Sequence, residues 1–197
     1  MSGERIGICV GRLDCVDTRR ADQACFATLS LAEKQRAESF AFERHRRQYV
    51  FAHRLLGLVL PAVVPQIASS DWCFVTDGYG RPLIAAATIA RMVYFSLSHT
   101  EVCVARAVSA WEAVGIDVDQ IHGRRALLTV ARSNFSPEET DALRKLPPGD
   151  LVDRFFDYWT LKAAYPNARG VSLNLPLNQF SILISAGRHI GIGFLLA

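Results

Sequence analysis

Two aspartates in the middle of the chain could hold a divalent cation. In the stretch VGIDVD, residues 114–119, apolar side chains alternate with Gly115, Asp117 and Asp119. Because successive side chains on a strand point to opposite faces, a strand here would bury the apolar residues and project both carboxylates together. Two carboxylates about 7 Å apart at their β-carbons can share one hard cation, and Mg²⁺ suits such a pair, with waters and substrate phosphates as its other ligands. The alternative is that both are solvated charges at a strand end, with Asp119 capping the next turn.

Hydroxyl and basic side chains form a second candidate group. The stretch FSLSHT leaves Ser98 and His99 where a strand turns, so that the pair could donate hydrogen bonds to a phosphate. Ser98 is a poor hydrolase nucleophile, because it has no glycine elbow. Arg81 in GYGRP is held out by a turn, and Arg54 projects from a helix. The alternative is that His99 is structural and that both arginines are plain surface charge.

A late segment, WTLKAAYPNARG at residues 159–170, carries Trp159, Lys162 and Arg169. It also contains Pro166, which lacks an N–H and would clash with the carbonyl of Lys162. The sequence therefore predicts that this helix ends or kinks about one turn early.

The surrounding elements read as strand, helices and strands in each half of the chain. The first half opens with a strand at RIGICVG, has a helix closed by Pro61 and Pro65, and continues with strands through residues 91–110. In the second half VGIDVD is read as a strand, and Ser136, Pro137 and Glu139 form a capping box at a helix start. A long helix and two strands follow. We therefore expect an α+β fold of two similar halves, residues 1–110 and 111–197, although the halves are too dissimilar in sequence to establish a repeat.

Composition narrows the class of protein. Half of the 197 residues are hydrophobic, which is typical of a globular chain, and no apolar run reaches the roughly 20 residues that a membrane span needs. The N-terminus lacks the features of a signal peptide, and five scattered cysteines suit reduced thiols, so we expect a cytoplasmic protein without a zinc site. Nineteen of the 22 basic residues are arginine, which suits contacts to phosphate, but the net charge of +3 is too small to argue for nucleic acid.

Taken in order, the stretches GYGRP, FSLSHT, GIDVD, FSPEE and FFDYWTLKAAYPNARG resemble the 4'-phosphopantetheinyl transferases of the surfactin-synthetase-activating type. The likeness runs from LAEKQRAESF to LNLPLNQFSI, and its strongest parts are G-I-D-x-[DE] and W-[ST]-x-K followed by a glycine-ended turn. It implies two similar α+β halves with coenzyme A in the cleft between them. It also implies Mg²⁺-dependent transfer of the phosphopantetheine arm to a serine of an acyl or peptidyl carrier protein, with release of adenosine 3',5'-bisphosphate.

The resemblance also implies roles for single residues. Asp117 and Asp119 match the family's metal-binding acids, and Lys162 matches a lysine beside the pyrophosphate. The coenzyme contacts that it implies are Ser98 and His99 at the phosphates, Arg54 and, more loosely, Lys34 at the 3'-phosphate end, and Arg81 near the nucleotide. The first half would thus lie on the nucleotide side of the cleft and the second on the side of the metal and the pyrophosphate.

The chain departs from the family where the resemblance matters most. Ala163 stands where the family has a glutamate directly after the motif lysine, and Asn167 stands in place of a second lysine. The family also continues with further strands beyond Ala197, so the second half is expected to be shortened. Two hypotheses arise: a phosphopantetheinyl transferase of reduced activity, or a non-catalytic relative that binds coenzyme A or a carrier protein. We expect a monomer that contacts neither nucleic acid nor membrane.

Overall fold

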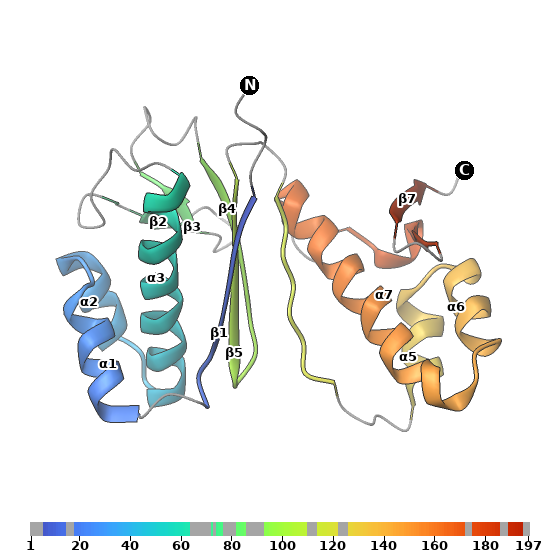
Figure 1. Ribbon diagram of the computed structural model, residues 1–197, viewed down its shortest axis with the longest axis horizontal. Helices are drawn as coiled ribbons and strands as arrows, with labels where there is room; N and C mark the ends of the chain where they lie inside the picture. Colours follow the sequence, from blue (N-terminus) through green and yellow to red (C-terminus); the bar gives the residue numbers. More distant parts are fainter. Residues whose placement is uncertain are drawn as a thin grey trace. The chain divides into compact units, whose positions relative to one another are not determined.

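The structure, a computed structural model, describes residues 6–14, 18–63, 72, 74–76, 82–85, 93–109, 114–121, 126–171, 175–185 and 189–194 (Figure 1). It divides into two compact units, Met1–Val118 (unit 1) and Asp119–Ala197 (unit 2). Each unit combines helices with antiparallel strands, which confirms the α+β class. The division between these two units falls after Val118, so Asp117 belongs to unit 1. None of the described helices is long and apolar enough to cross a membrane.

Unit 1 is built on a three-stranded antiparallel sheet in the order β1-β5-β4. Its elements are β1 (Ile6–Arg12), α1 (Thr18–Ala27), α2 (Leu31–Glu38), α3 (Glu43–Val63), β2 (Phe74–Thr76), β3 (Pro82–Ile84), β4 (Tyr94–His99) and β5 (Cys103–Ser109). Helix α3 packs against β1 and β5, and α1 and α2 pack against α3 (Figure 1). An added Cβ at Gly11 would lie 2.5 Å from the Phe51 ring, so this glycine allows the close approach of β1 to α3.

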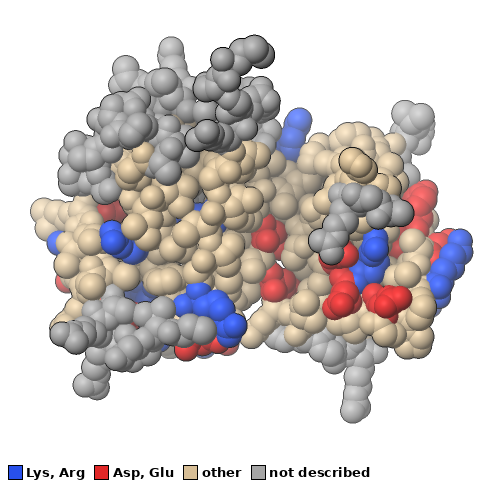
Figure 2. All heavy atoms as spheres, in the orientation of Figure 1, with Lys and Arg blue, Asp and Glu red and all other residues tan. Residues whose placement is uncertain are grey.

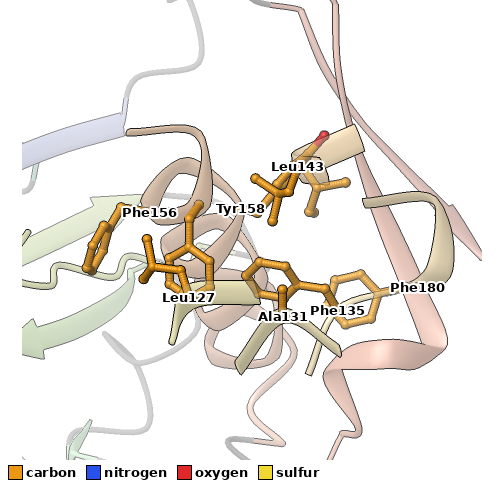
Figure 3. Packing of buried hydrophobic residues seen from close by; sticks show 9 residues of the cluster. Leu127, Ala131, Phe135, Leu143, Phe156, Tyr158 and Phe180 are labelled. Atoms are coloured by element: carbon orange, nitrogen blue, oxygen red, sulfur yellow. The ribbon is translucent and has the colours of Figure 1, made fainter. Parts of the chain in front are cut away.

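Unit 2 has the helices α5 (Leu127–Asn134), α6 (Pro137–Arg144) and α7 (Pro148–Arg169), a 3-10 turn at Leu177–Gln179, and the hairpin β6 (Phe180–Ile184) and β7 (Ile190–Phe194). Figure 3 shows its core, in which Leu127 and Ala131 of α5 meet Phe135, aromatic side chains of α7 and Phe180. The predicted capping box is confirmed: the Ser136 hydroxyl accepts the N–H of Glu139, and the Glu139 carboxylate accepts the N–H of Ser136.

The expected strand at residues 114–119 and the expected early end of the late helix are both wrong. Residues 114–121 form no strand, because the N–H groups of Ile116 and Val118 bond to serine hydroxyls of β4 instead of a backbone ladder. Helix α7 does not end before Pro166 but continues to Arg169. One missing N–H near a helix end costs a single intrahelical bond, and Pro166 is buried. The helix stops instead at Gly170, whose φ of 69° is the left-handed conformation that favours glycine.

Candidate functional site

The Asp117 carboxylate is held by a strand of its own unit. The Ser98 hydroxyl donates a hydrogen bond of 2.7 Å to Oδ1 of Asp117 and accepts the Val118 N–H at 3.2 Å. Two residues earlier on β4, the buried Ser96 hydroxyl accepts the N–H of Ile116 at 3.2 Å. Two serines on one face of β4 therefore fix the segment that carries the predicted acid, and the structure brings Ser98 and Asp117 together.

His99 does not share this contact. It follows Ser98 directly on β4, so the two side chains point to opposite faces, and His99 is exposed. The pKa of His99 is lowered from its usual value, first by partial loss of solvent and then by the positive charges of His45 and Arg106. The His99 imidazole is therefore neutral at neutral pH. It can offer a phosphate one N–H donor but no positive charge.

Asp119 is half-buried, and its Oδ1 accepts the N–H of Gln120 at 2.7 Å. The alternative that Asp119 caps a following turn stays a prediction, because residues 122–125 lie outside the described part of the chain. Carboxylate oxygens are the donors that Mg²⁺ prefers, so the chemistry of Asp117 and Asp119 fits that ion. Across the described part of the chain, however, no group of three or more His, Cys, Asp or Glu side chains is arranged to hold a metal.

The remaining predicted coenzyme contacts lie on the helices of unit 1. Lys34 of α2 lines a cavity of about 470 Å³, together with Phe26 and Arg46. Arg54 of α3 lines a separate cavity of about 30 Å³ beside Glu33. The structure therefore places these two cations on neighbouring helices but at different cavities, and Arg81 lies outside the described residues.

Lys162 is enclosed in unit 2. Its side chain is 0% exposed, and its Nζ lies 2.6 and 2.8 Å from the two carboxylate oxygens of Glu139. The ammonium also donates to the Phe180 carbonyl, and it lies 4.3 Å from the centroid of the Phe180 ring. Burial lowers the pKa of Lys162, while the hydrogen bond and the charge of Glu139 oppose this shift. Its predicted place beside a pyrophosphate stays a prediction.

The side chains around Lys162 differ from those on the surface of unit 2. Acidic and basic side chains are intermixed on the visible surface (Figure 2), and the exposed ion pairs of this unit include Arg144–Asp141. Trp159 stacks on Phe155 with an interplanar angle of 14° and belongs to the core.

Ala163 is half-buried on α7 and directly follows Lys162 in the sequence. No carboxylate therefore stands at the position after the lysine.

Two polar groups in unit 1 were not expected from the sequence. Nδ1 of His53 lies 2.6 Å from Oε1 of Glu33, and both side chains are largely buried, with 9% and 14% exposed. Arg106 of β5 is fully buried, and none of its side-chain nitrogens has a hydrogen-bond partner among the described residues. Its guanidinium lies 5.6 Å from the Phe95 ring centroid. His53 recurs with Val50, Leu56 and Leu60 at helical spacing, which is the sequence signal for its place on the apolar side of α3. An arginine in a strand gives no such signal of burial.

The matching family and the named relatives reported next are 4'-phosphopantetheinyl transferases. Residues 113–196 match the family described as ACPS, 4'-phosphopantetheinyl transferase superfamily. The 4'-phosphopantetheinyl transferase HetI of Nostoc sp. is 32% identical over 161 residues, which are 80% of this chain and 65% of that protein. The 4'-phosphopantetheinyl transferase Sfp of Bacillus subtilis is 31% identical over 175 residues, 83% of this chain and 75% of the relative.

A second Bacillus subtilis 4'-phosphopantetheinyl transferase is 29% identical, and the match covers half of its length. The chain thus spans about half to three quarters of these relatives. A solved holo-(acyl-carrier-protein) synthase from Bacillus anthracis, in complex with CoA (3',5'-ADP), aligns with a TM-score of 0.44 and 20% identity over 53% of this chain and 92% of that one.

Proposed function

Since this chain belongs to the 4'-phosphopantetheinyl transferase superfamily, we propose that it transfers the 4'-phosphopantetheine arm of coenzyme A to a serine of an acyl or peptidyl carrier protein. The observation that carries the proposal is the identity of about one third with named transferases, which extends over four fifths of the chain. The hydrogen bond between Ser98 and Asp117 supports it, because it orients one of the two acids that the family resemblance assigns to the metal.

The transfer forms a bond between the carrier serine oxygen and the phosphorus of the phosphopantetheine arm. The bond from that phosphorus to the bridging oxygen of the pyrophosphate breaks, and adenosine 3',5'-bisphosphate leaves. The serine proton passes to a general base. Mg²⁺, when bound, would neutralise the charge that develops on the diphosphate.

The chain's own residues would bind and orient these groups. Asp117 and Asp119 would hold the ion through carboxylate oxygens, and Ser98 would fix the direction of the Asp117 carboxylate. Lys34 and Arg54 would bind phosphate groups of the coenzyme, for which the arginine fork gives two parallel donors. His99 would donate one further hydrogen bond.

The test combines the purified chain with Mg²⁺, coenzyme A and several apo carrier proteins, and follows each carrier by mass spectrometry. The expected result is the added mass of the phosphopantetheine arm, together with release of the bisphosphate. If no carrier gains this mass at high enzyme concentration, the proposal that the chain transfers phosphopantetheine is wrong.

One observation favours a second candidate function, in which the chain binds coenzyme A or a carrier protein without transfer. Lys162 is enclosed by Glu139, and Ala163 supplies no carboxylate beside it. Isothermal titration calorimetry distinguishes the two functions: a binder takes up coenzyme A in a mixture where no carrier gains mass.

A further inference from the structure

The two units contain the same polar cluster at the start of corresponding helices. In unit 1, the Glu33 cluster (Ser30, Glu33 and His53) has the Ser30 hydroxyl accepting the Glu33 N–H at 3.4 Å and the Glu33 carboxylate accepting the Ser30 N–H at 2.7 Å. The second carboxylate oxygen of Glu33 binds His53 of the next helix at 2.6 Å. The glutamate therefore both caps α2 and ties it to α3.

The Glu139 cluster (Ser136, Glu139 and Lys162) repeats this arrangement in unit 2. The reciprocal capping bonds measure 3.3 and 2.9 Å, and Nζ of Lys162 of the next helix lies 2.8 Å from Oε1 and 2.6 Å from the capping Oε2. In the described part of the chain, Glu139 differs from Glu33 in that it also accepts a backbone N–H of β6, that of Ile182 at 2.6 Å. The glutamate and its helical partner are 20 residues apart in unit 1 and 23 apart in unit 2. Each capped helix has 8 residues, and the long helices have 21 and 22.

The partner of each glutamate also packs on an aromatic ring. The ring centroids of His53 and Tyr49 lie 4.1 Å apart, and Nζ of Lys162 lies 4.3 Å from the ring centroid of Phe180. The shared capping and the similar helix lengths lead us to treat His53 and Lys162 as corresponding positions of the two units, although the second pair is more deeply buried, at 0% and 2% exposed against 9% and 14%. Because His53 holds α2 and α3 together, we expect Lys162 to hold α6 and α7 together.

The residues that follow the cluster members differ between the units. Lys34 follows Glu33 and Arg54 follows His53, so in unit 1 a cation is the next residue in the sequence after each member of the pair. In unit 2 the same two positions are Thr140 and Ala163, which are uncharged. Among the described residues, only the Glu33 cluster is thus followed in sequence by cations, and these two line different cavities.

We propose that the Glu33 cluster is a positioning device that sets Lys34 and Arg54 for coenzyme A, and that Lys162 is its structural equivalent in unit 2 rather than a phosphate ligand. This rests on the proposed function, because it takes coenzyme A as the ligand. His53 and Glu33 touch no substrate in this scheme; they act through the two cations beside them.

The experiment measures coenzyme A affinity by isothermal titration calorimetry, and kcat and KM for carrier modification, in the wild type and three variants. His53→Ala removes the partner of Glu33, and we expect Kd and KM for coenzyme A to rise about tenfold or more with a smaller change in kcat. His53→Lys copies the partner that unit 2 uses, and we expect its affinity within about threefold of wild type because the lysine ammonium can donate a hydrogen bond to Glu33 in place of the imidazole.

The third variant tests Lys162 without leaving a buried charge. Glu139→Gln with Lys162→Met neutralises both partners, and we expect coenzyme A affinity within about twofold of wild type because Lys162 does not bind the coenzyme in this scheme. Circular dichroism and thermal unfolding check that each variant folds. If His53→Ala does not fold, Glu33→Gln replaces it with the same expectation.

Three outcomes would overturn the inference. The first is a His53→Ala protein with a lower unfolding temperature but unchanged KM and Kd for coenzyme A. The second is a His53→Lys protein as weak as His53→Ala, and the third is a tenfold loss of affinity in the double variant. Each leaves the proposed function standing if the wild type modifies a carrier. If the wild-type protein neither binds coenzyme A nor modifies a carrier, both the inference and the proposed function are wrong.

Discussion

Ser98 and Asp117 form one hydrogen-bonded unit, with the serine hydroxyl 2.7 Å from Oδ1 of the carboxylate. The same hydroxyl accepts the Val118 N–H, so it fixes both the side chain of the acid and the backbone beside it. Residues 114–121 have no strand ladder of their own. The direction of the Asp117 carboxylate therefore depends on a serine of β4.

Replacing Ser98 by alanine should reduce transfer more than it reduces stability. The Ser98→Ala protein loses a bond to a carboxylate and one to a backbone N–H, which together contribute about 1–3 kcal/mol to the free energy of unfolding. The loss of orientation at a metal-binding acid should lower the rate of carrier modification about 10–100-fold. Urea unfolding and initial rates measure the two effects.

The control for this prediction is Ser96→Ala. Ser96 accepts the Ile116 N–H at 3.2 Å, so this variant loosens the same segment while Ser98 still holds the Asp117 carboxylate. Transfer by the Ser96→Ala protein should stay close to wild type. Equal losses of activity in both variants would mean that the segment as a whole, and not the bond to Asp117, sets the rate.

Removing Lys162 alone should strongly destabilise the protein. Lys162→Met leaves Glu139 charged, with its side chain only 2% exposed, and breaking a buried ion pair in this way costs about 3–5 kcal/mol of unfolding free energy. Adding Glu139→Gln should recover most of this loss. Arg144→Ala, which breaks the exposed pair to Asp141, should cost under about 1 kcal/mol. Denaturant unfolding gives all three values; a Lys162→Met protein as stable as wild type contradicts the burial of the pair.

The pH dependence of stability should reveal the Glu33 cluster. Burial raises the pKa of Glu33, but the hydrogen bonds from His53 and Ser30 outweigh it, so the pKa lies below its usual 4.5. Between the folded pKa and 4.5 the unfolded chain binds more protons, so stability falls as pH falls through this window. The contribution is fully present above pH 4.5 and is lost below the folded pKa.

Urea midpoints of wild type and Glu33→Gln, taken from neutral pH down to below the folded pKa of Glu33, measure this effect. The difference between the two proteins should be constant near neutral pH and shrink once the pH falls below 4.5. Glu43→Gln changes an exposed carboxylate that is 67% accessible, and its curve should follow that of wild type. A Glu33→Gln difference that does not change with pH would contradict the lowered pKa.

Arg106→Met should stabilise the protein. The fully buried guanidinium has no hydrogen-bond partner within the described residues. Burial lowers the pKa of Arg106 to about 9 against the opposing attraction of Glu33, so at neutral pH the guanidinium is still charged. An apolar side chain of similar length removes that cost, and we expect a gain of about 1–3 kcal/mol in unfolding free energy. Thermal unfolding measures it, and a clear loss of stability would show that the charge has a stabilising role.

The sequence predicted local features of this fold better than its contacts. The capping box of Ser136 and Glu139 depends on residues three apart, and it is confirmed. Alternation of apolar and polar residues in 114–119 predicted a strand, but it could not reveal that serines of β4 replace a strand partner. The enclosure of Lys162 depends on a glutamate 23 residues away, for which spacing gives no signal.

Restoring a carboxylate after Lys162 should raise transfer, and it tests whether Ala163 limits the reaction. Ala163 is half-buried on α7, where the family resemblance implies a glutamate that binds the metal. We expect Ala163→Glu to increase Mg²⁺-dependent carrier modification, by as much as about 10²–10³ if this group acts like other well-placed electrostatic groups. The matched control is Ala164→Glu, which places the same charge about 100° around the helix and should not increase the rate. Initial rates with Mg²⁺ and with EDTA measure the effect. Equal rates for both variants, or a gain that survives EDTA, would show that Ala163 is not the missing ligand position.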